Sequence, residues 1–126
     1  MPPDNRGPRA ITSGAAARKE ELHRHAEQHL RTAGLQILDR NWRSAGATID
    51  IVATEHRILV ACTVRVSSRP TPAAGLSRAQ RARLQRAGIS WLTAHGLLFD
   101  EIRVDTIGIH RGPGGTLVIT HTRGGG

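Results

Sequence analysis

The sequence predicts an α/β fold, in which a mixed sheet of about five strands is flanked by two helices in the order α-β-β-β-α-β-β. Three observations support this prediction. Apolar residues recur at helical spacing in two segments, strand-like runs lie between Gly- and Pro-rich turns, and the second helical segment separates two of these runs. A helix between two strands usually joins parallel strands, whereas short turns join antiparallel ones, so we expect both kinds of pairing.

The first helix is predicted over residues 15–33, after a candidate N-cap at Ser13 and before a stop at Gly34. One apolar stripe defines it. The stripe consists of Leu22, Ala26, Leu30 and Ala33. Residues 1–13 are rich in Pro, Gly, Asn and Arg and have almost no apolar content, so we expect a flexible basic arm.

Five short runs are typical of strands. They span residues 35–43, 48–53, 58–66, 102–110 and 116–122. The third run is almost continuously apolar, which predicts burial on both faces, and a polar turn before it predicts an antiparallel hairpin. The second helix begins after a cap at Ser77 and ends before Gly96. It therefore connects the third run to the fourth.

The length of 126 residues fits one domain, which we place over residues 14–122, with residues 123–126 as a loose tail. Cys62 is the single cysteine, so it forms no internal disulfide, and we expect a reducing, cytoplasmic location. Its apolar neighbours favour a small buried side chain over a nucleophile. No apolar run reaches the ~20 residues of a membrane span, so no membrane partner is expected.

The net charge of +8, from 18 basic and 10 acidic side chains, favours a polyanionic partner such as nucleic acid. All basic residues except Lys19 are arginines, so genomic base composition is an alternative explanation of this usage. The aromatic residues are few, namely Trp42, Trp91 and Phe99. A stacking platform for single strands is therefore not expected, and phosphate contacts are the favoured mode of binding.

Several short motifs together resemble one protein family. They are Ala26-x-x-x-Leu30 followed by Gly34, Asn41-Trp42-Arg43, Ile49-Asp50-Ile51-Val52-Ala53, Leu59-Val60, Trp91-Leu92 and Arg103-Val104-Asp105-Thr106-Ile107-Gly108. Over roughly residues 22–110 the chain resembles the YraN-like family of uncharacterised bacterial proteins. That family is placed among restriction-endonuclease-like folds, near Holliday junction resolvases. The resemblance therefore implies a nuclease-like architecture.

The chemistry implied by the resemblance is metal-dependent cleavage of a phosphodiester, for which carboxylates hold Mg²⁺ and a lysine assists. The family positions correspond to His23 for a helix glutamate, Thr48 and Asp50 for a Glu-x-Asp pair, Thr63 and Arg65 for a Glu-x-Lys pair, and a site near Gln80 for a further lysine. Only Asp50 keeps a carboxylate. Arg65 keeps the positive charge of the lysine but stays protonated and is no general base.

The sequence thus predicts a nucleic-acid-binding protein of nuclease-like fold that is catalytically degenerate, with no cofactor. The phosphate contacts are assigned to the N-terminal arm and to Arg40, Arg43, Arg65, Arg69, Arg78 and Arg81. DNA is the expected partner, although another nucleic acid is equally compatible with these contacts. Resolvase-like folds often act as dimers, and the sequence leaves a homodimer open.

Two alternatives remain. The first is an endonuclease with a relocated carboxylate, in which Glu20 or Glu27 joins Asp50 as a ligand, and only this alternative requires Mg²⁺. Glu27 lies one helical turn after His23, which puts both on one face. The second alternative is a protein-interaction module that reuses the former active-site cleft.

Overall fold

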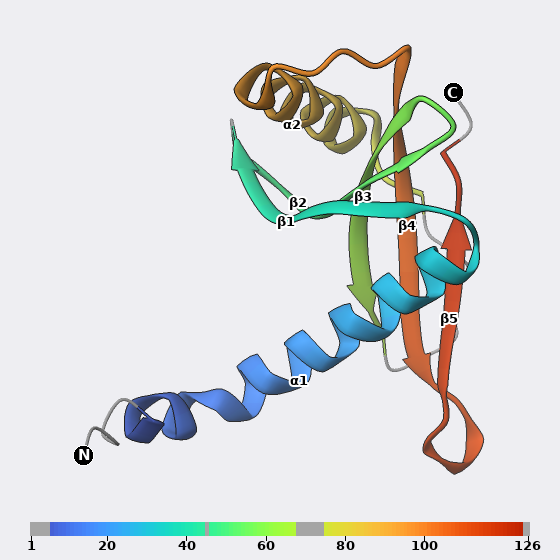
Figure 1. Ribbon diagram of the computed structural model, residues 1–126. Coiled ribbons are helices and arrows are strands. Elements are labelled where there is room, and N and C mark those ends of the chain that lie inside the picture. The colour runs from blue at the N-terminus through green and yellow to red at the C-terminus, as the bar shows by residue number, and fades with distance from the viewer. Residues whose placement is uncertain (1–5, 45, 68–74, 125–126) are drawn as a thin grey trace.

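The computed structural model describes residues 6–44, 46–67 and 75–124, with side chains described from residue 14 onward. Within these ranges, two helices and five strands follow the predicted order (Figure 1). The elements are α1 (Arg6–Thr32), β1 (Gln36–Ser44), β2 (Ala47–Glu55), β3 (Ile58–Val66), α2 (Arg78–His95), β4 (Glu101–Arg111), the 3-10 turn η2 (Pro113–Gly115) and β5 (Leu117–Thr122). The predicted α/β fold with a five-stranded mixed sheet is confirmed.

The strands lie in the sheet in chain order, β1-β2-β3-β4-β5. The β3–β4 pair is parallel, with Ile58 beside Glu101 and Val66 beside Ile109. The three remaining neighbouring pairs are antiparallel. The predicted hairpin of β2 and β3 and the predicted parallel crossover through α2 are therefore both confirmed.

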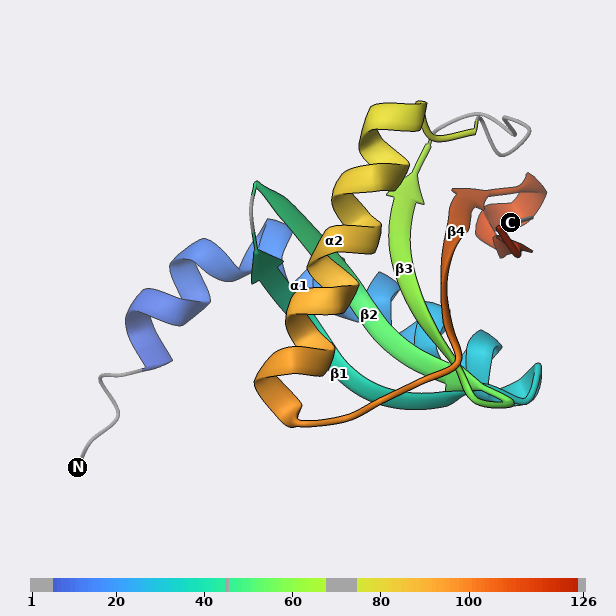
Figure 2. The ribbon, with the colours of Figure 1, turned by 90° about the horizontal axis from the view of Figure 1, so that it is seen from above.

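The two helices cover opposite faces of the sheet (Figures 1 and 2). The core under α1 consists of Ala26, Leu30, Leu35, Ile51, Ala53, Val60, Cys62, Ile107 and Ile109. The core under α2 consists of Ile49, Val52, Leu59, Ala61, Leu84, Ala87, Trp91 and Val104. Burial of β3 in both cores explains its nearly continuous apolar sequence. None of the described helices is both long and apolar enough to cross a membrane.

The first helix begins earlier than the sequence predicted. α1 starts at Arg6 rather than after Ser13, so it includes residues 6–13 of the segment expected as an arm. Pro8 lies in the first turn, where the missing N–H costs no helical hydrogen bond, and the Ala- and Arg-rich residues that follow favour a helix. This part has no apolar stripe, which is why hydrophobic periodicity did not indicate it.

The second helix has the predicted ends. Ser77 and Gln80 form a capping box, in which each side chain accepts a hydrogen bond from the other residue's backbone N–H. Gly96 ends the helix in the left-handed conformation at φ 63°. His95 stacks on Trp91 with ring centroids 4.1 Å apart, although its side chain is 39% exposed. Gln80, which lies near the position where the resemblance implies a lysine, is therefore engaged in the capping box with Ser77.

An irregularity in β1 places Arg40 and Trp42 on opposite faces of the sheet, although residues two apart in a regular strand share a face. Asn41 has a positive φ of 52°, which asparagine tolerates better than most residues. Before it, Arg40 contacts Glu27 of α1, and after it, Trp42 packs into the core under α2. Arg40 therefore contacts the helix on one side of the sheet, whereas Trp42 packs on the other side.

Candidate functional site

Asp50, the site aspartate expected from the resemblance, lies where β2 and β3 separate. The paired register of these strands ends at Ile51 and Cys62. One residue beyond it, Asp50 Oδ2 accepts a hydrogen bond from the backbone N–H of Val64 at 2.7 Å and lies 3.4 Å from Thr63 Oγ1. The carboxylate thus satisfies a backbone donor that the interrupted ladder leaves without a partner. Asp50 has a structural role in addition to any chemical one.

The other matched positions on the strands supply no second carboxylate. Thr48 is exposed and lies opposite Arg43 of β1, and Thr63 presents a neutral hydroxyl beside Asp50. Arg65 is half-buried beside Gly108 of β4. Mg²⁺ in proteins is usually held through carboxylates together with water and substrate oxygens. These residues therefore do not reproduce the donor set that the resemblance implies.

His23, the remaining matched position, lies in a separate pocket between α1 and β1. The pocket has a volume of about 480 Å³. Its lining consists of Ala16, Lys19, Glu20, His23, Arg24, Glu27, Arg40, Asn41 and Arg43. The structure thus brings together several predicted site residues from the helix and the first strand. Neither Asp50 nor Thr63 contributes to this lining.

Glu27, a candidate relocated ligand, is 5% exposed and is held by arginines. Arg40 donates to it through Nε at 2.5 Å and Nη2 at 2.8 Å, and Arg31 Nη2 lies at 3.5 Å. A metal ion at Glu27 would have to displace this bidentate pair. In the part of the chain that the structure describes, no three His, Cys, Asp or Glu side chains form a group that could hold a metal ion.

The described lysine and arginines fall into two sets, except for Arg111, which donates to the carbonyl oxygen of Gly115 and forms no ion pair. The arginines paired with carboxylates are Arg31, Arg40, Arg57, Arg103 and Arg123. The described basic residues that form no ion pair and no side-chain hydrogen bond are Arg18, Lys19, Arg24, Arg43, Arg65, Arg78, Arg81, Arg83 and Arg86. We call this second set the unpaired cations.

The six arginines predicted to contact phosphates do not all belong to the unpaired cations. Arg43, Arg65, Arg78 and Arg81 are unpaired cations. Arg40 is paired with Glu27, but its side chain remains 54% exposed. Arg69 lies outside the described residues, as do residues 1–5 of the predicted arm.

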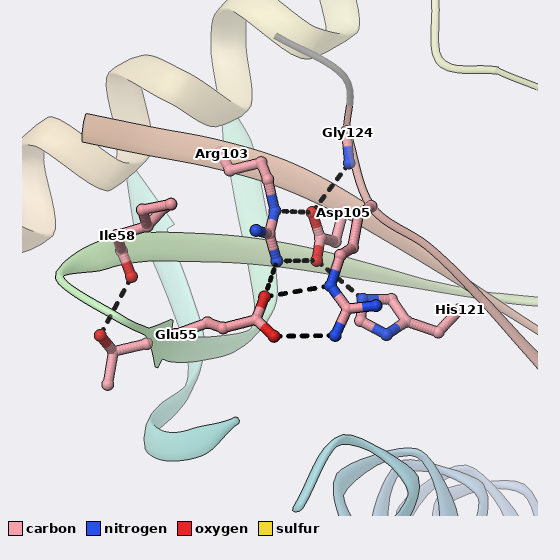
Figure 3. Close-up of polar contacts among 8 residues, drawn as sticks. Glu55, Ile58, Arg103, Asp105, His121 and Gly124 are labelled. Carbon is pink, nitrogen blue, oxygen red and sulfur yellow. Dashed lines mark hydrogen bonds and ion pairs between the residues drawn. The ribbon is translucent and has the colours of Figure 1, made fainter. Parts of the chain in front are cut away.

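A second polar cluster extends from Glu55, next to the turn of the β2–β3 hairpin, to Asp105, which lies beside Cys62 in the sheet (Figure 3). Asp105 is fully buried and accepts two hydrogen bonds from Arg103, at 2.7 and 2.9 Å. It also accepts one from His121 Nε2 at 2.7 Å and one from the N–H of Gly124 at 3.0 Å. Arg103 further donates to Glu55 at 2.7 Å.

The same cluster holds Arg123 and Gly124, the first two residues of the tail that was predicted to be loose. Arg123 donates to both oxygens of Glu55, at 3.0 and 2.8 Å, and Gly124 is held by Asp105. Arg103 and Asp105 are two residues apart on β4 and share a face of the strand, whereas Glu55, His121 and Arg123 are distant in the sequence. The cluster cannot be recognised from the sequence, because these residues are far apart along the chain and only the register of the sheet brings them together.

The cluster shifts the pKa values of its carboxyl groups. Hydrogen bonds from Arg123 lower the pKa of Glu55 to about 2, against the opposing effect of burial, and Arg103 adds to the lowering. Burial raises the pKa of Asp105, but hydrogen bonds from His121 and Arg103 outweigh it and bring the value to about 2. Both groups are therefore ionised at neutral pH, and every cation of the cluster is neutralised locally.

Cys62 is an unreactive core residue. It is fully buried in the core under α1, and burial raises the pKa of its thiol well above the ordinary value. Because the thiolate is the nucleophilic form, this position is unsuited to catalysis.

The sequence resembles several curated proteins, each described as a UPF0102 protein. One from Nocardioides sp. is 35% identical over 120 residues, which covers 90% of this chain and 97% of that protein. One from Acidothermus cellulolyticus is 37% identical over 101 residues, covering 75% and 74% of the two chains. One from Beutenbergia cavernae is 32% identical over 106 residues, covering 82% and 90%.

A solved structure of SfsA from Pyrococcus furiosus in complex with Ca²⁺ matches 88% of this chain and 64% of its own, at 14% identity and a TM-score of 0.37. A likeness this low indicates nothing about function. The family profile described as "Uncharacterised protein family UPF0102" matches residues 22–109, which include both helix–sheet interfaces and all the matched strand positions. Together with the similarity to the curated relatives, this match shows that the chain belongs to the UPF0102 family.

Proposed function

We propose that the protein binds nucleic acid through phosphate contacts and that its nuclease-like centre is catalytically degenerate. The observation that carries this proposal is the division of the charges. The unpaired cations have no carboxylate partner within the described ranges, so their charge is available to a polyanion. Four of the described carboxylates, Glu27, Glu55, Asp100 and Asp105, are already paired with other arginines.

The unpaired cations on the strands lie away from the paired Glu55. Glu55 lies at the end of β2 next to the hairpin turn, and Asp105 lies in the middle of β4 beside Cys62; both are paired with arginine. Arg65 lies toward the other end of β3, beside Gly108, and Arg43 lies opposite Thr48 at the start of β2. A polyanion would therefore be attracted to the end that also carries the matched family positions.

The chemistry of these residues supports binding more than cleavage. An arginine offers several N–H donors in a fixed plane that suits phosphate oxygens, and its charge persists at all accessible pH values. Thr48 and Thr63 add no negative charge for a metal ion, and Asp50 is engaged with the backbone of β3. The proposed role is therefore recognition of a phosphate backbone without hydrolysis.

The test is fluorescence anisotropy of labelled four-way, duplex and single-stranded DNA at several salt concentrations with Mg²⁺, followed by a denaturing gel of the same samples. We expect binding whose affinity falls with salt at a log–log slope of several units, since each phosphate contact contributes ~0.9. We also expect intact strands on the gel. Cut strands would instead support the endonuclease alternative, and no binding at moderate salt would favour the protein-interaction alternative.

A further inference from the structure

We propose that the pocket between α1 and β1 binds the terminal phosphate monoester of a nucleic-acid strand. This inference rests on the proposed function and assigns one part of it to one site. The pocket is concave, with a volume of about 480 Å³, which is within the range of small-ligand sites. Its lining combines cations from a helix and from a strand, so their relative positions are fixed by the fold.

The charges in the pocket favour an anion. Three unpaired cations line it, namely Lys19, Arg24 and Arg43, together with the paired Arg40. The carboxylates in the lining are Glu20 and Glu27, and Glu27 is already neutralised by Arg40. Four cationic side chains and two carboxylates line the pocket, so the lining keeps an excess of positive charge without any contribution from His23.

The buried glutamate positions one of these cations. Glu27 is 5% exposed and engages Nε and Nη2 of Arg40, which leaves Nη1 outside that contact. The hydrogen bonds with Glu27 raise the pKa of Arg40, so the pairing holds a charged guanidinium in one orientation at the pocket. Arg40 is half-exposed despite this contact, and its remaining donors are free to reach a ligand. Glu27 is thus a positioning residue rather than a ligand contact.

The strand supplies a second sign of a built site. Asn41, with φ 52°, lies in the pocket lining between Arg40 and the half-buried Trp42. Left-handed backbone in a non-glycine residue carries a conformational cost, and such residues are enriched at ligand sites. The conformation lets β1 direct Arg40 toward α1 while Trp42 anchors the strand in the other core.

Charge and shape both favour a terminal phosphate over an internal one. A phosphate monoester carries about −1.5 to −2 at neutral pH, whereas each internal diester carries a single negative charge. Several cations around one pocket are better matched by the monoester. In addition, a strand end can enter a concave pocket, whereas an internal phosphate continues into nucleotides on both sides.

The experiment compares three single strands of one sequence, which end in a 5′-phosphate, a 3′-phosphate or hydroxyl groups only, each labelled away from the end compared. Anisotropy titrations would use the wild type, Lys19→Ala and Arg24→Ala. Arg57→Ala is the matched control, because Arg57 is an exposed arginine at the other end of the β2–β3 hairpin. We expect a terminal phosphate to tighten binding about tenfold, since a hydrogen bond to a charged group is worth at least that factor.

The increase in affinity that a terminal phosphate causes should be smaller in Lys19→Ala and Arg24→Ala and should be unchanged in Arg57→Ala. Glu27→Gln should reduce the ratio between phosphorylated and hydroxyl strands while leaving the affinity for the hydroxyl strand nearly constant, an effect that loss of stability alone does not produce. Equal affinity for all three strands, or a gain that survives both pocket substitutions, would overturn the assignment and leave the proposed function standing. Binding of no strand would overturn both.

Discussion

Asp50 accepts a hydrogen bond from the backbone N–H of Val64 at 2.7 Å, immediately beyond the last paired residues of β2 and β3. A side-chain oxygen here takes the place of a strand carbonyl. Asp50, the only carboxylate among the positions expected from the resemblance, therefore has a structural role that is independent of metal binding.

This role predicts different effects for two substitutions of Asp50. Asp50→Asn keeps an oxygen that can accept from Val64 and should change the free energy of unfolding little. Asp50→Ala leaves the N–H without its partner and should lower the free energy of unfolding by about 1–3 kcal/mol. Urea unfolding of the two variants checks this. Equal losses in both would show that the charge, rather than the hydrogen bond to Val64, stabilises the strands.

Acid should destabilise the protein through Glu55 and Asp105. Their folded pKa values of about 2 lie below the ordinary values of 4.5 and 3.8, so their contribution is complete above pH ~5 and is lost as the pH falls toward 2. For Glu55 the full loss is on the order of 3 kcal/mol.

Urea unfolding between pH 6 and pH 2.5 measures this dependence, and Glu55→Gln is the comparison. The variant should start from a lower stability and lose less of it on acidification, because one of the titrating groups is gone. A pH dependence identical to that of the wild type would contradict the assignment to Glu55.

Gly124 should tolerate no side chain. A Cβ at this position would lie 2.0 Å from the carbonyl oxygen of Val104, which is backbone and cannot move aside freely. Gly124→Ala should therefore break the hydrogen bond to Asp105 and lower the free energy of unfolding by about 1–3 kcal/mol. Gly75→Ala is the control, because among the described residues no atom beyond its chain neighbours lies within 4 Å of a Cβ there. Comparable losses in both variants would rule out the steric explanation.

Cys62 should resist thiol reagents in the folded protein. Burial keeps the side chain away from solvent and raises the pKa of its thiol, so reaction requires opening of the core. A chromogenic disulfide reagent should react slowly under native conditions and completely in urea. Rapid reaction without denaturant would mean that the core under α1 opens readily.

Much of the fold was predictable because local and global signals agree. β3 was predicted with its observed ends, since its apolar run is bounded by a polar turn and a Pro-rich loop. The ends of α2 followed from Ser77 and Gly96, whose side-chain and backbone properties act locally. The beginning of α1 was missed because residues 6–13 form helix without an apolar stripe.

The candidate site was less accessible from the sequence. Glu27 was recognised as a possible ligand through its spacing from His23, but its pairing with Arg40 depends on the positive φ of Asn41, which no spacing rule indicates. Likewise, Asp105 meets His121 and Glu55 meets Arg123 only through the sheet register. Which arginines remain unpaired is therefore a property of the three-dimensional structure.

The most direct test of the central claim compares Arg65→Ala with Arg57→Ala in DNA-binding titrations at several salt concentrations. Both substitutions remove one positive charge, but Arg65 is an unpaired cation at the proposed interface, whereas Arg57 is paired with Asp100 at the other end of the hairpin. The account predicts that Arg65→Ala weakens binding and reduces the log–log salt slope by about 0.9, while Arg57→Ala leaves both nearly unchanged. Unaltered affinity and slope in Arg65→Ala, or equal losses in both variants, would contradict it.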